Sequence, residues 1–163
     1  MKQPAHVSTA VIDLPVGRVR ISANQQALTG IDYVTARVKL KTASTWITRE
    51  AVRQLHHYVN DAAFGFDLPL QFEGSRFQNR VWQALRAIKP GKPLTYGGLA
   101  EKLDSGARAV GNACRQNPLP IIIPCHRVVA ANGLGGYAGH IQGKVLDRKR
   151  WLLAHEGFGC QPP

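Results

Sequence analysis

Residues 121–129 read Ile-Ile-Ile-Pro-Cys-His-Arg-Val-Val, and this stretch restricts the possible folds more than any other segment. A β-branched run predicts a buried strand, which Pro124 must end because proline has no N–H for a sheet ladder. Cys125 is therefore predicted on a rigid turn directly after a core strand, with His126 beside it. A thiol is a strong nucleophile only as thiolate, which an adjacent imidazole favours. The pair is either a nucleophile with its base or a buried thiol beside a core histidine.

The cysteines indicate where such a chain works. There are three, Cys114, Cys125 and Cys160, and their spacing is neither that of a disulfide framework nor that of a Cys-rich zinc site. Free thiols are typical of the cytoplasm, or of the nucleus in a eukaryote. No apolar run is long enough to span a membrane, and the N-terminus lacks a secretory segment. We therefore expect a cytoplasmic protein without a membrane partner.

Positive charge is concentrated in the second half of the chain. The formal net charge is +11 over 163 residues. Residues 75–163 carry thirteen Lys or Arg against four Asp or Glu, whereas residues 1–74 carry eight against six. A basic domain attracts polyanions, usually nucleic acid. The alternative is a cationic surface that serves only solubility.

The first half predicts a small α/β domain over residues 1–74. Short apolar segments separated by turns at residues 14–17 and 24–25 predict a β-meander over residues 6–40, with residues 38–40 as its last part. Thr48 precedes a predicted helix over residues 49–60, whose apolar residues lie on one face. The following Pro- and Gly-containing segment, residues 61–74, coincides with the change in charge and predicts the domain boundary.

The second half, residues 75–163, predicts a mainly helical domain. Ser75 and Gln78 have the spacing of a capping box, so a helix should run from there to about residue 88. Two short helices, residues 97–103 and 107–115, flank a tight turn and predict a helix-turn-helix. The second of them carries small side chains, either for close approach to a groove or for tight packing against the core.

Two segments after the helix-turn-helix bear on Cys125. Residues 117–120 read Asn-Pro-Leu-Pro, a stiff turn that would fix the second helix relative to the thiol. A last helix, residues 144–155, is predicted to turn its apolar residues inward and Arg148, Lys149 and Arg150 outward. Glu156 falls at its C-terminus, where the helix dipole disfavours a carboxylate, so a partner such as His126 is expected unless Glu156 is simply exposed at a fraying end.

These motifs together resemble the O6-alkylguanine-DNA alkyltransferases, also called methylated-DNA–protein-cysteine methyltransferases. The resemblance covers residues 77–157, about half of the chain. Its most specific parts are the Pro124–Arg127 motif and the preceding Asn-Pro turn. The other matching segments are residues 81–85, 96–97, 107–111, 136–137 and 151–157.

The resemblance implies a fold, a reaction and a set of site residues. The first domain would be ribonuclease-H-like. Cys125 would accept the alkyl group of O6-alkylguanine, and of O4-alkylthymine, irreversibly and once, while His126, oriented by Glu156, draws off the thiol proton. Double-stranded DNA containing alkylated guanine would lie with its minor groove on the helix-turn-helix, and the protein would act as a monomer. Tyr96 would bond the purine and Arg108 would fill the gap left by the flipped base. Gln78, Gly97 and Ala131 would contact the DNA backbone. Asn117 would be the hinge, and Pro120 and Tyr137 would line the pocket.

Three departures from the family pattern and three rival functions remain. Ala138 replaces a serine of some members, and residues 140–143 are extra material beside the pocket. The zinc ligands of some N-terminal domains have no match, so neither metal nor cofactor is expected.

The rivals are a lesion-sensing protein without transfer activity, a helix-turn-helix transcription factor and a Cys-His hydrolase. The sensing proteins lack the acceptor cysteine, and small side chains on a recognition helix read no base sequence.

Overall fold

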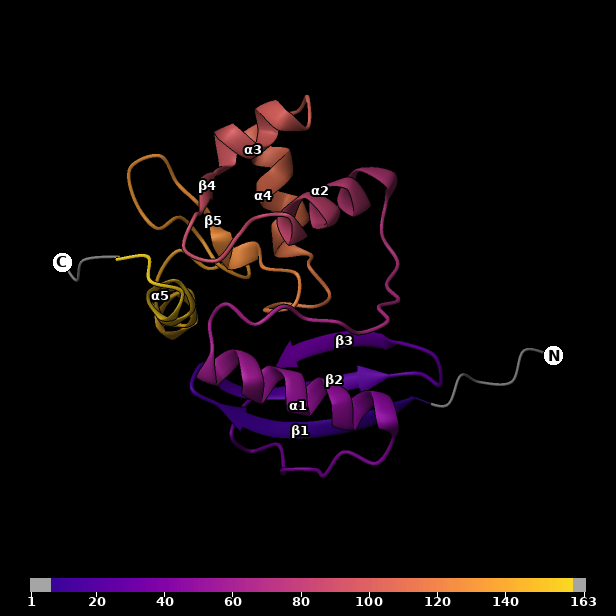
Figure 1. Cartoon of the computed structure of the whole chain (residues 1–163). Helices are drawn as coiled ribbons and strands as arrows, with labels where there is room; N and C mark the ends of the chain where they lie inside the picture. The colour runs from indigo at the N-terminus through magenta and orange to yellow at the C-terminus, as the bar shows by residue number, and fades with distance from the viewer. Residues whose placement is uncertain (1–6, 160–163) are drawn as a thin grey trace. The chain divides into compact units, whose positions relative to one another are not determined.

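The computed structural model describes residues 7–159, so Cys160 lies outside the described residues. The chain divides into two compact units, Met1–Glu73 and Gly74–Pro163. Figure 1 traces their helices and strands along the chain.

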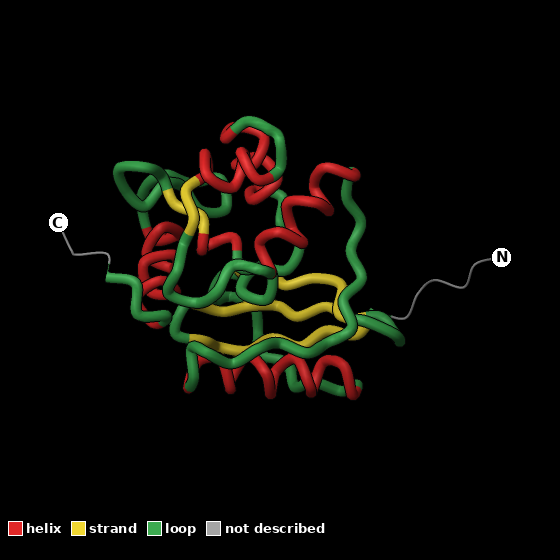
Figure 2. Tube along the Cα trace, turned by 45° about the horizontal axis from the view of Figure 1, so that its top comes forward, coloured by secondary structure: helices red, strands yellow, loops and turns green. Residues whose placement is uncertain are grey.

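The first unit is a three-stranded antiparallel sheet covered on one face by a helix (Figures 1 and 2). The strands β1 (Ser8–Leu14), β2 (Gly17–Ala23) and β3 (Leu28–Tyr33) pair in sequence order, as the meander predicts. The helix α1 spans Trp46–Asn60 and starts earlier than expected, because Thr45 and Thr48 form a capping box. Residues 38–40 are not a strand, since only Lys41 pairs with the edge strand, at Val11.

The second unit holds the predicted helices. They are α2 (Arg76–Arg86), α3 (Tyr96–Lys102), α4 (Ala107–Arg115) and α5 (Lys144–His155). The capping box of Ser75 and Gln78 is confirmed, and the indole Nε1 of Trp82 donates to the Ala113 carbonyl at 2.9 Å, which fixes α2 against α4. Residues 103–106 join α3 to α4 as the predicted helix-turn-helix.

The prediction of a strand at Ile121–Ile123 is wrong, although all three residues are buried. Ile121 has φ +76°, and the Ile123 N–H donates to the Leu119 carbonyl at 2.8 Å, as in a turn. The strand that follows it is the two-residue β5 (Val128–Val129), which pairs in parallel with β4 (Leu94–Thr95). Hydrogen bonds of a turn therefore replace a sheet ladder in front of Cys125.

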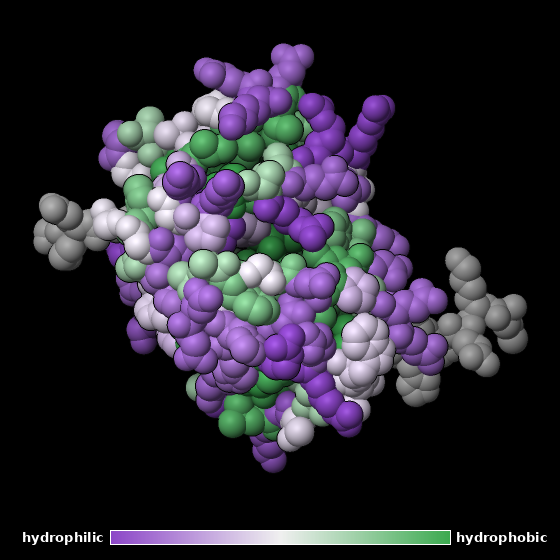
Figure 3. Space-filling model, in the orientation of Figure 1, coloured by the Kyte–Doolittle hydropathy of each residue, from purple (hydrophilic) through white to green (hydrophobic). Residues whose placement is uncertain are grey.

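Among residues 7–159, no helix is both long and apolar enough to cross a membrane. The face drawn in Figure 3 is covered mainly by hydrophilic side chains, with hydrophobic residues in small separate areas.

Candidate active site

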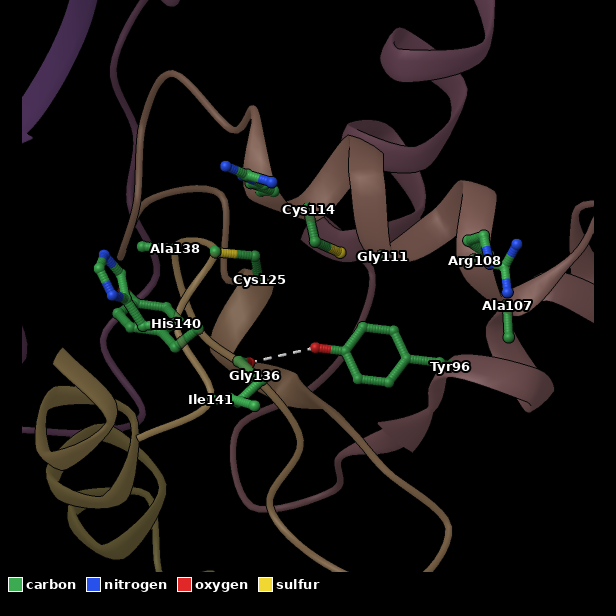
Figure 4. A pocket seen from close by; sticks show the side chains of 13 residues that line it. Tyr96, Ala107, Arg108, Gly111, Cys114, Cys125, Gly136, Ala138, His140 and Ile141 are labelled. Atoms are coloured by element: carbon green, nitrogen blue, oxygen red, sulfur yellow. Dashed lines mark hydrogen bonds between the residues drawn. The ribbon is translucent and has the colours of Figure 1, made fainter. Parts of the chain in front are cut away.

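A cavity of about 420 Å³ opens beside Cys125 in the second unit (Figure 4). Side chains from α3, α4 and the segment before α5 surround it. Most of them are small or apolar, and Arg108 and Arg115 bring positive charge from α4. The lining residues are Tyr96, Ala107, Arg108, Gly111, Cys114, Arg115, Cys125, Gly136, Tyr137, Ala138, Gly139, His140 and Ile141.

Cys125 begins a single turn of 3₁₀ helix, η1 (Cys125–Arg127), and backbone geometry fixes its position. Pro124 has φ −82° and ψ 67°, and the Cys125 N–H donates to the Ile123 carbonyl at 2.8 Å, which together make an inverse γ-turn. The Asn117 side chain donates to the same Ile123 carbonyl at 2.7 Å and accepts from the Leu119 N–H at 2.9 Å. Asn117 therefore ties the end of α4 to the turn that carries Cys125, and its role as a hinge stays a prediction.

The thiol of Cys125 is buried, with 6% of the residue exposed. Burial raises the pKa of the Cys125 thiol, while a hydrogen bond from Asn117 and the charge of Lys149 act in the opposite direction. The resting thiol is therefore protonated, and it needs a base before it can attack.

A histidine is next to it in the chain, within a buried group of three ionisable residues. His126 Nε2 lies 2.8 Å from Glu156 Oε1, and both side chains are fully buried. Arg127 donates to the same carboxylate through Nε at 3.1–3.2 Å and through Nη2 at 2.9 Å, and its Nη1 donates to the Ile88 carbonyl at 2.6 Å. The expected partner of Glu156 is thus present, together with a second one.

The electrostatics of this group assign the protons. Burial opposes the ionised form of Glu156, but the hydrogen bonds from His126 and Arg127 lower its pKa to about 2. Burial lowers the pKa of His126, more strongly than Glu156 raises it, so the imidazole is neutral near pH 7. An ionised carboxylate only accepts, so Nε2 carries the proton and Nδ1 the lone pair. Among the described atoms Nδ1 has no hydrogen-bond partner, which leaves it available as a base.

The C-terminus of α5 explains how Glu156 reaches this position. Glu156 caps the helix, with its N–H bonded to the Leu152 carbonyl at 3.1 Å. Gly91 passes so close that a Cβ there would lie 2.7 Å from the Glu156 carbonyl oxygen, and its φ is +74°. A side chain at position 91 would push the capping residue away from His126.

Tyr96, the first residue of α3, faces the cavity from the opposite side and donates its hydroxyl to the Gly136 carbonyl at 3.2 Å (Figure 4). The Lys149 Nζ donates to the same carbonyl at 2.9 Å and to the Val128 carbonyl at 2.6 Å. It also lies 5.5 Å from the centre of the Tyr96 ring. The prediction that Lys149 points outward is therefore wrong: the residue is fully buried, because two carbonyls and an aromatic face take the place of water.

The residues expected to meet DNA come from different elements of the second unit. Arg108 is exposed on the first turn of α4, at the rim of the cavity. Gly97 and Ala131 are exposed, so their main chains are accessible. The Gln78 side chain is engaged within the protein, because it caps α2 and donates to the Gln116 side chain.

Two of the three expected pocket residues line the cavity, and one does not. Tyr137 is buried in its wall, and Ala138 lies at its edge with φ +49°. Pro120 is half-buried in the turn before Cys125 and is not among the described residues that line the cavity.

Three further residues belong to this site and were not expected from the sequence. Two of them, Arg127 and Lys149, are buried cations. The third is Cys114, which also lines the cavity, and burial raises the pKa of its thiol to about 12. The sequence held one signal that Lys149 is buried, because this residue falls at helical spacing between the apolar Leu146 and Leu153.

Among residues 7–159, no group of three or more His, Cys, Asp or Glu side chains is arranged to hold a metal ion. The expected lack of metal and cofactor stays a prediction.

Comparisons with known proteins agree on one activity. Residues 76–158 match the family model of the 6-O-methylguanine DNA methyltransferase DNA-binding domain. The methylated-DNA–protein-cysteine methyltransferase of Methanosarcina acetivorans is 37% identical over 156 residues, which are 91% of this chain and 97% of that protein. The corresponding protein of Mycolicibacterium paratuberculosis is 40% identical over 152 residues, 89% of each chain.

Solved structures agree as well. The crystal structure of Mycobacterium tuberculosis O6-methylguanine methyltransferase has a TM-score of 0.78 and 35% identity, over 92% of each chain. That of M. tuberculosis OGT in complex with DNA has a TM-score of 0.76 and 35% identity, over 91% of this chain and 92% of the other.

Proposed function

This chain belongs to the methylated-DNA–protein-cysteine methyltransferase family, which repairs DNA by moving a methyl group from O6-methylguanine to a protein cysteine, and we propose that Cys125 is the acceptor. The observation that carries this proposal is the position of Cys125, which lines the cavity beside the buried His126–Glu156 pair. Since the product is a thioether, which has no easy hydrolytic exit, each molecule acts once.

The first step is removal of the thiol proton. His126 Nδ1 takes it, directly or through one water, while Nε2–H remains bonded to Glu156. The carboxylate stabilises the imidazolium that forms, and Arg127 keeps the carboxylate ionised and oriented. His126 is thus the base, and Glu156 and Arg127 are positioning residues.

The second step is displacement at carbon. The Cys125 thiolate forms the S–C bond as the C–O bond breaks, and the electron pair stays on guanine, which recovers a proton at its ring. Tyr96 supplies a hydrogen bond to the purine once it releases the Gly136 carbonyl. Lys149 keeps its hydrogen bond to the Gly136 carbonyl, and its positive charge lies near both the thiolate and the leaving base.

DNA binding brings the lesion to this cavity. We expect a monomer that places α4 in the minor groove of double-stranded DNA, acts on flipped alkylguanine or O4-alkylthymine, and works in the cytoplasm or nucleus. Small residues on α4, exposed at Ala107 and half-buried at Ala109 and Gly111, permit close approach to the groove, and Arg108 at the rim occupies the space of the flipped base. Gly97, Ala131 and the start of α2 at Gln78 contact the DNA backbone.

The proposal is tested with a Cys125→Ala variant and a duplex containing O6-methylguanine. The variant should bind this duplex as wild type does, since the small side chain leaves the α4 surface intact, but its mass should stay unchanged. A Cys114→Ala variant should still end with one methyl group per molecule. Methyl uptake by Cys125→Ala would overturn the assignment.

A further inference from the structure

The extra residues before α5 are built onto a tight hairpin at the edge of the cavity. Tyr137 and His140 exchange hydrogen bonds of 2.8 and 2.9 Å. The two residues between them, Ala138 and Gly139, have φ +49° and +82°, as a type I′ turn requires. A Cβ on Gly139 would lie 2.7 Å from Arg115 Nε, so the turn is packed against α4. The hairpin therefore directs the following residue, Ile141, back over the cavity.

Ile141 is an apolar side chain that nothing in the described structure covers. It is 76% exposed, the highest value among the exposed large apolar residues of the described chain. Its Cγ2 would lie 3.6 Å from a Cβ on Gly136, so it packs over the glycine whose carbonyl accepts the Tyr96 hydroxyl. Figure 4 shows it beside Gly136, around the same hollow as Cys125.

The cavity is larger than a methyl group requires. Its volume of about 420 Å³ falls in the range of pockets for drug-sized ligands, about 300–1,000 Å³. A methyl group is comparable to one water molecule, about 30 Å³. Glycines and alanines form much of the lining, and Ile141 offers apolar surface at the mouth.

We propose that Ile141 is a specificity-determining residue, which covers large apolar O6 substituents such as benzyl and so favours them over methyl. This inference rests on the proposed role of Cys125. The reaction is unchanged: sulfur bonds to the benzylic carbon, the C–O bond breaks, and the electron pair stays on guanine. A benzyl group extends beyond the acceptor carbon and can bury the Ile141 side chain, whereas methyl does not reach it.

Single-turnover rates on two duplexes, one with O6-benzylguanine and one with O6-methylguanine, test this inference. Ile141→Ala should lower the ratio of the benzyl rate to the methyl rate about tenfold, the low end of the effect of a methylene in an apolar pocket. Ile141→Leu should restore most of the ratio. Gln142→Ala, a change at the neighbouring exposed residue outside the lining, should keep the wild-type ratio.

An unchanged ratio in Ile141→Ala would overturn the inference, and so would an equal loss on both duplexes, because that loss would place Ile141 in DNA binding or loop folding. Peptide mapping of the wild-type protein separates this failure from that of the proposed function. If both alkyl groups are found on Cys125 while the ratio is unchanged, only the role of Ile141 is wrong. If neither is found there, the acceptor assignment itself is wrong.

Discussion

Replacing Glu156 by Gln removes the one negative charge between His126 and Arg127 while keeping the size of the side chain. Arg127 then remains buried with only neutral acceptors, the new amide oxygen and the Ile88 carbonyl, in place of a carboxylate. The pKa of Glu156 falls from 4.5 to about 2 on folding, which corresponds to about 3 kcal/mol of stability at pH 7. Breaking a buried ion pair costs about 3–5 kcal/mol. We therefore expect a loss of about 3 kcal/mol.

The same charge should matter for alkyl transfer. Without the carboxylate, the imidazolium of His126 loses its stabilising partner, and Nδ1 becomes a weaker base. We expect transfer to Cys125 to slow by about 10²-fold, the low end of the range for general-base catalysis. Single-turnover kinetics on methylated duplex measure this directly.

The pH dependence shows whether the effect is electrostatic. A carboxylate whose pKa is lowered on folding stabilises the protein above its unfolded-state value of 4.5 and loses this contribution as the pH falls toward 2. Wild type and Glu156→Gln should therefore differ by about 3 kcal/mol at pH 7 and converge near pH 2. The lowered pKa of His126 adds a separate loss of stability below pH 6.5.

Urea denaturation at several pH values measures these free energies of unfolding. Asp147→Asn is the matched control, because Asp147 pairs with Arg150 on the exposed face of α5, where such a pair contributes about 0–1 kcal/mol. A gap between wild type and Glu156→Gln that is the same at pH 7 and pH 2 would refute the electrostatic reasoning.

Three further predictions concern Lys149, Arg108 and salt. Lys149→Met should slow labelling of Cys125 by iodoacetamide near pH 7, because the thiolate loses a nearby cation. Lys144→Met, a change at an exposed residue of the same helix, should not slow it. Faster labelling of the Lys149→Met variant would contradict this. Arg108→Ala should slow repair of duplex DNA but not transfer from O6-benzylguanine as a free base; equal slowing on both would place Arg108 in the fold or the pocket. DNA binding should weaken steeply between about 50 and 200 mM salt, and a flat response would argue against phosphate contacts by the basic unit.

The sequence predicted those elements whose signals are local. Capping boxes and helical spacing are decided within one or two turns, which is why α2, α4 and α5 lie where expected. A β-branched run is a weaker signal, because it reports burial rather than pairing. Ile121–Ile123 are buried without a ladder, since Ile121 adopts a positive φ that β-branched residues rarely take.

The site was predictable where the type and position of a residue suggest its role. It was not predictable where tertiary contacts place a residue against the usual preference of its type. The position of Glu156 at a helix C-terminus suggested a partner, and His126 is that partner. Lysine is almost never fully buried, so the position of Lys149 required knowledge of the two carbonyls that receive it. Ile141 reaches the cavity only through a hairpin whose first positive-φ residue is an alanine.

The most direct test of the acceptor assignment is peptide mapping after reaction with a duplex whose O6-methyl group carries an isotopic label. We predict one labelled methyl group per molecule, located on Cys125, with no further uptake when excess duplex is added. Label on Cys114 or on another residue, or more methyl groups removed from DNA than protein molecules present, would contradict it.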